Sequence, residues 1–453
     1  MTPVIAAIAT ASGAAGIGVV RLSGDGAAAV ADRVFRARGR GKTLAALPGY
    51  TALYGTVSDD DGAIDDCVAL VFRAPHSYTG EDVVELSCHG GTYLLRRVLR
   101  AVCAAGAVPA GAGEFTKRAF LLGKMDLTEA DAVMDLIAAE GRLSARMALG
   151  AHEGAVGRAV TACRDGLLGA AAQLAAVVDY PYEDIPELDG EALDARLREA
   201  EERLGALLST FEAGRILREG VDTVIVGCPN VGKSTLMNRL AGVERSIVTD
   251  VAGTTRDIVE ERVRLGEVTL RLADTAGIRE TEDTVEKIGV ERARQRMRSA
   301  ALRLCLFDGS RPLSAEDRAL AEQAGREAVA VIGKADLPQR LDPRELQPRF
   351  AHVVRLSAAT GEGLEQLEQA VAEVCGVAGL TGEEAVLSTE RQRDGVVRAR
   401  ESVREAREAL AAGLPDAAAV SVDAAVDALA VLTGERATEA VVNEVFSRFC
   451  VGK

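Results

Sequence analysis

The residues with the clearest chemistry form a glycine-rich loop near the middle of the chain. An apolar run, Val221–Val226, leads into Gly227–Thr235, which reads GCPNVGKST and precedes a helix expected to begin near Lys233. In such a loop, backbone N–H groups wrap phosphates at a helix N-terminus, where the helix dipole favours anions. The pattern G-x-x-x-x-G-K-S predicts that Lys233 reaches the outer phosphates of a nucleotide and that Ser234 ligates Mg²⁺.

Two polar motifs follow this loop in chain order. Gly253–Asp257 reads GTTRD, and a threonine hydroxyl from it can complete the Mg²⁺ shell. Asp274–Gly277 reads DTAG and follows a predicted strand, Val268–Ala273. This arrangement brings a carboxylate near the metal and a glycine N–H near the γ-phosphate.

The base of the nucleotide is expected to meet two later motifs. Lys334-Ala335-Asp336 follows a strand that ends at Ile332, and Ser357–Ala359 follows the next strand. Asp336 can accept two hydrogen bonds from guanine, from N1–H and from the exocyclic amine, which adenine cannot offer as a pair. The ordered set of motifs therefore predicts a GTP-binding domain.

The elements around these motifs change along the chain. Residues 1–118 alternate short strands, such as Val4–Ala9 and Ile17–Leu22, with glycine turns, and residues 92–105 predict a helix, which indicates an α+β domain. Residues 119–214 carry apolar residues at helical spacing. Residues 215–379 alternate strands and helices, which predicts a parallel, doubly wound sheet. Because residues 380–453 are helical again, we expect the α/β domain to be inserted into a helical domain.

Composition excludes several classes of function. The net charge of −15 argues against a chain that grips phosphate backbones over its whole surface, although a partner could supply a basic surface. The absence of Trp and an aromatic content of 3% argue against wide base-stacking platforms. Scattered cysteines without a C-x-x-C pair, a start without signal-peptide features and the lack of a long apolar run predict a cytoplasmic protein without a membrane span.

The nucleotide motifs resemble those of translation-factor-related GTPases, with two departures. Gly333 stands where that family usually has an asparagine, which braces the phosphate loop and contacts the base. We therefore expect weaker nucleotide binding but retained guanine selectivity through Asp336. Ile278 stands where Ras-like GTPases carry the glutamine that orients the attacking water, so another residue must do this work or hydrolysis must be very slow.

The whole chain resembles the MnmE (TrmE) family of tRNA-modification GTPases. The resemblance includes Ser77–Leu86, which reads SYTGEDVVEL, Gly113–Phe120, which reads GEFTKRAF, and the terminal Phe449–Lys453, which reads FCVGK. It implies a multidomain fold: an α+β folate-binding-like N-terminal domain (1–118), a helical bundle domain (119–214 and 380–453) and an inserted α/β Ras-like P-loop GTPase domain (215–379).

The resemblance also assigns roles to residues. It implies K⁺ ligands at Asn230, Thr249, Val251 and Thr254, Mg²⁺ ligands at Ser234 and Thr255, catalytic residues Glu286, Lys233 and Cys450, and folate contacts from Arg21, Glu85, Lys124 and Lys453. With the motifs above, the expected GTP contacts are Asn230, Val231, Gly232, Lys233, Ser234, Thr235, Thr249, Thr254, Thr255, Asp274, Thr275, Ala276, Gly277, Lys334, Asp336, Ser357, Ala358 and Ala359.

The function implied by the resemblance is GTP-driven tRNA modification. A homodimer would join an FAD-dependent MnmG-type partner in a heterotetramer and add a carboxymethylaminomethyl or aminomethyl group to C5 of the wobble uridine. The one-carbon unit would come from a tetrahydrofolate derivative, and the amine from glycine or ammonium. Two alternatives stay open: an RNA- or ribosome-associated GTPase switch without modification chemistry, and a helical dimer scaffold with a degenerate GTPase domain.

Overall fold

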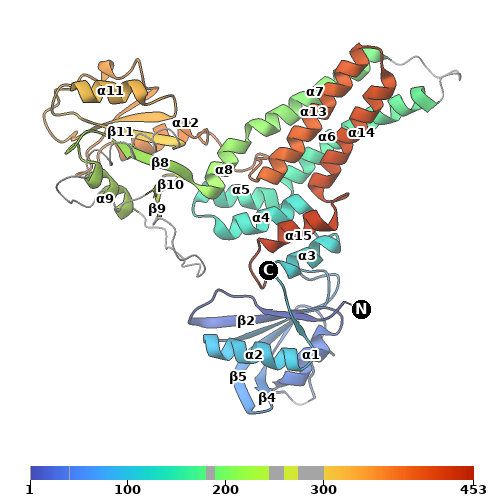
Figure 1. Cartoon of the computed structure of the whole chain (residues 1–453). Coiled ribbons are helices and arrows are strands. Elements are labelled where there is room, and N and C mark those ends of the chain that lie inside the picture. Colours follow the sequence, from blue (N-terminus) through green and yellow to red (C-terminus); the bar gives the residue numbers. More distant parts are fainter. Residues whose placement is uncertain (1, 40, 180–188, 244–259, 274–299) are drawn as a thin grey trace. The chain divides into compact units, whose positions relative to one another are not determined.

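The computed structural model describes residues 2–39, 41–179, 189–243, 260–273 and 300–453 (Figure 1). Contacts divide the chain into two units: Met1–Met134 with Val426–Lys453, and Asp135–Ala425. Segments from both ends of the sequence therefore belong to the same unit. In the part of the chain that is described, no helix combines the length and the apolar character that crossing a membrane requires.

The first unit contains a mixed sheet with two helices on one face. Its strand order is β3-β4-β5-β6-β2-β1-β7, and its pairs are antiparallel except β1 with β7. The strands are β1 (Ile5–Ile8), β2 (Ala15–Ser23), β3 (Phe35–Ala37), β4 (Thr51–Asp59), β5 (Gly62–Phe72), β6 (Val83–Gly90) and β7 (Val108–Pro109). Helices α1 (Ala27–Val34) and α2 (Thr92–Ala104) cover one face (Figure 1).

Strand alternation in this sheet decides where charged residues lie. Val20 and Leu22 are fully buried in the core that α1 and α2 cover. Because successive side chains of a strand point to opposite faces, Arg21 lies on the other face. The register of β2 and β6 pairs Arg21 directly with Glu85, so their side chains are neighbours on that face.

Helical segments complete the first unit. They are α3 (Glu114–Leu121), α15 (Glu439–Ser447), α4 (Leu127–Ala138) as far as Met134, and α14 (Pro415–Thr433) from Val426 onward. Leu127 and Val133 of α4 form a buried cluster with Phe446 and Phe449 from the last part of the chain. The final residues then reach the sheet domain, where Val451 forms a β-bridge with Ala112.

The second unit begins and ends with helices. These are α5 (Arg142–His152), α6 (Ala155–Asp179), α7 (Gly190–Ser209), α8 (Phe211–Glu219) and α13 (Glu390–Ala411). Leu197 and Leu204 are buried on α7, and Val396 and Val403 are buried on α13, which packs along α7. The apolar spacing of the sequence thus forms a helix–helix core, as predicted.

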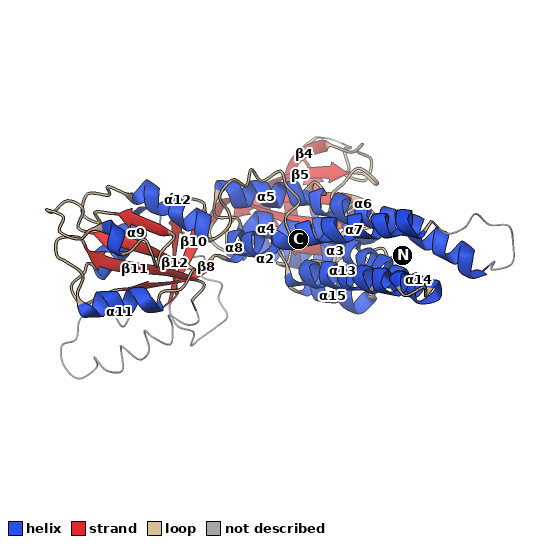
Figure 2. Cartoon of the chain, turned by 90° about the horizontal axis from the view of Figure 1, so that it is seen from above, coloured by secondary structure: helices blue, strands red, loops and turns tan. Residues whose placement is uncertain are grey.

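In the sequence, a sheet with helices on both faces comes between α8 and α13. Its strand order is β13-β12-β11-β8-β10-β9, and all neighbours are parallel except β9 and β10. The strands are β8 (Val221–Val226), β9 (Glu260–Leu265), β10 (Val268–Ala273), β11 (Leu302–Asp308), β12 (Ala328–Gly333) and β13 (His352–Arg355). Helices α9 (Lys233–Val243) and α12 (Leu364–Val374) lie on one side and α11 (Ala315–Gln323) on the other, as Figure 2 shows.

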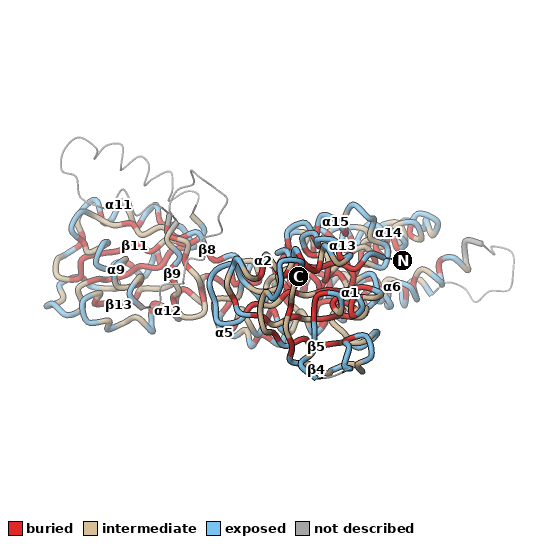
Figure 3. The backbone as a smooth tube through the Cα atoms, turned by 90° about the horizontal axis from the view of Figure 1, so that it is seen from below, coloured by how far each residue is buried: buried red, intermediate tan, exposed pale blue. Residues whose placement is uncertain are grey.

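The central strand β11 shows why the strands of this sheet have continuous apolar sequences. Leu304 and Leu306 point into the core beneath α9 and α12, whereas Cys305 and Phe307 point into the core beneath α11. Both faces of the strand are therefore buried (Figure 3). The predicted doubly wound sheet is confirmed, with the antiparallel edge strand β9 as an addition that the sequence pattern missed.

Candidate functional site

The predicted phosphate loop connects β8 to α9. Val231 is buried beneath the loop, and Asn230 and Gly232 have positive φ values of 58° and 105°. The Lys233 ammonium lies inside the loop and donates to the carbonyl oxygens of Gly227 at 2.8 Å and Cys228 at 2.9 Å. Burial lowers the pKa of Lys233. The loop thus surrounds a cation at the N-terminus of a helix, where a phosphate chain fits.

The first turn of α9 carries the two hydroxyl residues predicted for this site. Ser234 and Thr235 are exposed, directly after Lys233. A hydroxyl at this position can ligate Mg²⁺ beside bound phosphates. Within the described ranges, no cluster of three or more acidic, histidine or cysteine side chains suited to a metal occurs.

Two loops at the carboxyl ends of β12 and β13 meet at the predicted base site. The Ser357 hydroxyl donates to Asp336 Oδ1 at 2.6 Å, and this bond holds the pKa of Asp336 below its usual range. Asp336 is therefore an ionised acceptor at neutral pH, as guanine recognition requires. Ser357 is fully buried, and Ala358 and Ala359 follow it in the same loop.

Lys334 connects the base loop to the phosphate loop. Its ammonium donates to Asp308 Oδ2 at 2.7 Å and to the Asn230 carbonyl oxygen at 3.3 Å. Burial alone would raise the pKa of Asp308, but the hydrogen bonds from Lys334 and Ser310 outweigh it and leave the pKa lowered. Sequence analysis missed Asp308, although its place at the carboxyl end of a buried strand is a signal for a site residue.

Several predicted site residues lie outside the described residues. They are Thr249, Val251, Thr254, Thr255, Asp274, Thr275, Ala276, Gly277 and Glu286, together with Ile278. Their predicted roles in holding Mg²⁺, K⁺, the γ-phosphate and the attacking water stay predictions.

A second group of predicted residues meets in the N-terminal unit. The Arg21 guanidinium binds Glu85 Oε1 through Nε and Nη2, both at 2.8 Å, and its Nη1 donates to the Gly452 carbonyl oxygen at 3.4 Å. The same guanidinium lies 5.5 Å from the ring centre of Tyr78 and 5.7 Å from that of Phe115. Sequence analysis did not single out these two rings as site residues.

Backbone hydrogen bonds hold the last residues of the chain beside this ion pair. Gly113 N–H donates to the Cys450 carbonyl oxygen at 3.3 Å, and Phe115 N–H donates to a Lys453 oxygen at 3.2 Å. A Cβ at Gly452 would lie 2.4 Å from the Ile8 carbonyl oxygen, so only glycine fits there. Burial, and then the neighbouring Arg21 charge, lowers the pKa of Lys453.

Cys450 and Lys124 lie at the edge of this cluster. Cys450 is exposed. Lys124 donates to the Pro75 carbonyl oxygen at 3.2 Å and packs against Gly80, so it contacts the loop that carries Tyr78. The structure thus brings Arg21, Glu85 and Lys453 together, with Lys124 on the adjacent loop. A half-buried guanidinium between aromatic rings suits a flat ligand with negative charge.

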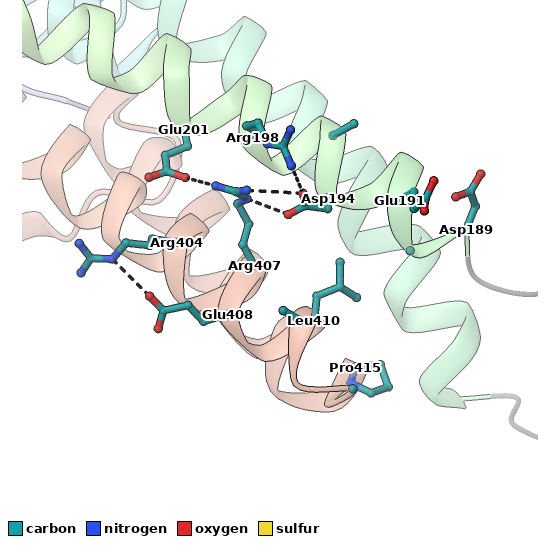
Figure 4. Close-up of a pocket in the computed structure, with 14 residues that line it drawn as sticks. Asp189, Glu191, Asp194, Arg198, Glu201, Arg404, Arg407, Glu408, Leu410 and Pro415 are labelled. Atoms are coloured by element: carbon teal, nitrogen blue, oxygen red, sulfur yellow. Dashed lines mark hydrogen bonds and ion pairs between the residues drawn. The ribbon is translucent and has the colours of Figure 1, made fainter.

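A cavity of about 1290 Å³ between α7 and α13 contains none of the predicted site residues (Figure 4). Arg407 spans it, donating to Asp194 Oδ1 at 2.8 Å and to Glu201 Oε2 at 2.7 Å. Arg198 also bonds Asp194 at 2.6 Å. Because these charges neutralise one another, we interpret the side chains that line the cavity as an ion-pair network that joins the two helices.

Comparison with known proteins gives the family. Residues 4–124 match the model of the GTP-binding protein TrmE N-terminus, and residues 127–450 match the model of the MnmE helical domain. The tRNA modification GTPase MnmE of Heliobacterium modesticaldum is 42% identical over 462 residues, and that of Symbiobacterium thermophilum is 44% identical over 455 residues. Each alignment covers 99% of this chain and 99% of the relative.

Among solved structures, the chain is similar to two GTPase structures over part of its length. The G domain of the T. maritima FeoB iron transporter is 28% identical, with 34% of this chain and 98% of that chain covered and a TM-score of 0.25. Era of Aquifex aeolicus bound to GDP and AlF4⁻ is 25% identical, with 40% and 66% covered and a TM-score of 0.26. From the two family models and the full-length relatives, the chain belongs to the MnmE family of tRNA modification GTPases.

Proposed function

We propose that this GTPase is the GTP-hydrolysing subunit of an enzyme that modifies the wobble uridine of tRNA. It would work with an FAD-dependent MnmG-type partner in a heterotetramer and add an aminomethyl or carboxymethylaminomethyl group to C5. The observation that carries the proposal is the tail of the chain fastened beside Arg21 and Glu85. A GTPase switch that only binds RNA or ribosomes has no use for such a cluster.

In the GTP site, the chain's own groups would bind and polarise the triphosphate. Lys233 would exchange its two loop carbonyl contacts for β- and γ-phosphate oxygens. Hydrolysis forms a bond from a water oxygen to the γ-phosphorus and breaks the bond from that phosphorus to the bridging oxygen, which leaves with GDP. Ser234 and Thr255 would hold Mg²⁺, which neutralises the charge that develops on the phosphates.

Glu286 would replace the missing glutamine, and a K⁺ ion would replace an arginine finger. Glu286 would orient the water, because Ile278 can neither donate nor accept a hydrogen bond. Asn230 and the carbonyls of Thr249, Val251 and Thr254 would hold K⁺, which supplies positive charge to the transition state in place of an arginine finger. GTP turnover in KCl and in NaCl tests this: we expect strong stimulation by K⁺, loss of that stimulation in Asn230→Ala, and no turnover in Glu286→Ala with near-normal GTP affinity. Equal rates in the two salts would exclude it.

In the N-terminal cluster, the cations would hold a tetrahydrofolate derivative, which supplies the one-carbon unit. Arg21 and Lys124 would pair with folate carboxylates, and the rings of Tyr78 and Phe115 would flank the guanidinium. Glu85 and Lys453 would complete the folate contacts, and burial lowers the pKa of Lys453. Cys450, which is exposed, is the proposed catalytic thiol of this cluster.

The proposed assembly is a cytoplasmic homodimer that joins through the N-terminal domain. A net charge of −15 fits a division of labour in which the flavin partner carries most of the tRNA-binding surface.

The test is nucleoside analysis of tRNA from cells that lack this protein and carry either the wild type, Lys233→Ala or Arg21→Ala. We expect the C5 modification of the wobble uridine to disappear without the protein, to return with the wild type, and to stay absent with either variant. Unchanged wobble uridine in cells lacking the protein would overturn the proposal in favour of an RNA- or ribosome-associated switch. Absence of GTP turnover by the purified chain would favour the scaffold alternative.

A further inference from the structure

The turn that carries Lys334 and Asp336 is held by a side chain outside every motif. Gln339 Nε2 donates to the Lys334 carbonyl oxygen at 2.8 Å and to the Leu337 carbonyl oxygen at 2.9 Å. The turn is closed by Leu337 N–H, which donates to the same Lys334 oxygen at 3.0 Å. Lys334 has a positive φ of 58°, a conformation that an ordinary residue keeps only when its surroundings hold it.

The orientation of the Gln339 amide is fixed by these contacts. A flipped amide would place Oε1 against two carbonyl oxygens, all of them acceptors. In the observed orientation, Oε1 is buried and has no hydrogen-bond partner among the described residues. Leaving a buried acceptor unpaired is unfavourable, so the two bonds from Nε2 are what retain the amide at this place.

Two glycines explain why this amide is needed and how it fits. A Cβ at Gly309 would lie 2.2 Å from Gln339 Oε1, so a side chain there would expel the amide. Gly333 lies against the phosphate loop, since a Cβ there would be 3.7 Å from the Val231 carbonyl oxygen, but it offers no side chain to hold either loop.

We propose that Gln339 is a positioning residue for guanine recognition. Its amide holds the 334–337 turn so that the Asp336 carboxylate faces the base edge, while Ser357 holds that carboxylate from the other side. This inference rests on the GTP site of the proposed function and extends it to a residue that acts through the backbone of the turn.

The test compares Gln339→Glu with Gln366→Glu in the full-length chain. The first variant keeps the size of the side chain but replaces the donor by a carboxylate facing two carbonyl oxygens. The second makes the same change of charge at an exposed position on α12. Isothermal titration would give the affinities for GDP and for IDP, which lacks the exocyclic amine that Asp336 is expected to bind.

We expect Gln339→Glu to bind GDP about tenfold more weakly, which corresponds to about 1.4 kcal/mol. The ratio of GDP affinity to IDP affinity should fall severalfold, and Gln366→Glu should match the wild type in both. A loosened turn lowers this ratio, whereas general damage to the domain lowers both affinities equally. The neutral variant Gln339→Met should show the same loss of ratio if the carboxylate prevents folding.

An unchanged GDP affinity in both Gln339 variants, or equal losses for GDP and IDP, would overturn the inference. A wild-type chain that binds neither nucleotide would instead overturn the GTP site itself, so the two failures are distinguishable.

Discussion

The phosphate loop and the N-terminal cluster are built from the same chain in opposite ways. In the phosphate loop, Lys233 bonds carbonyl oxygens only six and five residues away. In the N-terminal cluster, Arg21 bonds Glu85 at a sequence separation of 64 and Gly452 at a separation of 431. The first site is contained in one loop, whereas the second exists only after distant segments have met.

Because of this difference, the two sites should respond differently to mutations elsewhere in the protein. A contiguous loop keeps its geometry as long as one strand and one helix pack. A site assembled from separate segments depends on every packing contact between them, so we expect it to be the more sensitive to changes elsewhere in its unit.

The largest expected effect is the loss of turnover in Lys233→Ala. Removing one cation from a preorganised phosphoryl-transfer site lowers the rate by about 100-fold or more. GTP hydrolysis by the purified chain measures this, and calorimetry with 5-formyl-tetrahydrofolate should show unchanged binding. If folate binding also fell, the two sites would not be independent. Lys42→Ala, at an exposed lysine, is the control.

Asp336→Asn should exchange the preferred base. Two hydrogen bonds to an ionised acceptor are lost, so guanine nucleotides should bind about 100-fold more weakly. Xanthine nucleotides should gain affinity, because their C2 oxygen accepts a bond from the new amide. Competition between XDP and GDP measures the exchange, and a variant without any gain for XDP would mean that guanine is recognised by other residues.

Arg21→Ala should weaken binding of 5-formyl-tetrahydrofolate by about tenfold or more, the value of a hydrogen-bonded charge, and leave GTP affinity intact. Arg21→Lys keeps the charge but lacks the planar fork that binds Glu85, so it should recover only part of the loss. Arg38→Ala, which removes an exposed arginine paired with Asp66, is the matched control. Equal folate affinity in Arg21→Ala would remove this residue from the site.

Gly333→Asn should tighten GDP and GTP together by about threefold, within the net value of one hydrogen bond. The added Cβ would approach Leu306 Cδ1 at 3.3 Å, and the end of that side chain can move. Nucleotide dissociation rates measure the effect. Slower dissociation of GTP alone would contradict it, because the side chain is expected to act at the base side.

The smallest expected effect concerns the pH dependence of stability. Burial, and then a hydrogen bond to Asp317, raises the pKa of the Cys228 thiol from near 9 to about 11. As the pH rises, the unfolded chain loses this proton before the folded chain does. The stabilisation that the protonated thiol gives the folded state is therefore fully present below about pH 9 and is lost as the pH rises toward 11.

The free energy of unfolding of Cys228→Ser should therefore differ from that of the wild type by less than about 1 kcal/mol at pH 7, which is the net value of an ordinary hydrogen bond. This difference should shrink toward pH 11. Thermal unfolding at pH 7, 9 and 10.5 would measure it. A difference that grows with pH would contradict the assigned direction.

Sequence patterns predicted the contiguous site well. Strand β8 spans Val221–Val226 and helix α9 begins at Lys233, as the apolar run and the glycine pattern required. The meeting of Asp336 and Ser357 also follows from a general rule, because loops after neighbouring parallel strands lie at the same edge of a sheet.

Other elements gave no such signal. Strand β9 reads EERVRL, and its charges are typical of an edge strand that must not pair further, not of a buried one. Strand β4 mixes Gly55 and several polar residues with apolar ones, so its alternation is weak. Gln339 belongs to no motif, and the approach of Gly452 to Arg21 depends on register and tertiary packing, which only the resemblance to a family anticipated.

The last residues of the chain complete the first unit, for example through the bridge between Ala112 and Val451, so this unit cannot finish folding until synthesis is nearly over. A ribosome releases the sheet domain and the first turns of α4 long before α15 exists, because residues 135–425 are translated in between. During that interval, Leu127 and Val133 lack Phe446 and Phe449, the partners that cover them in the finished unit. The nascent chain must therefore keep this apolar surface from aggregating while an entire GTPase domain folds ahead of its completion.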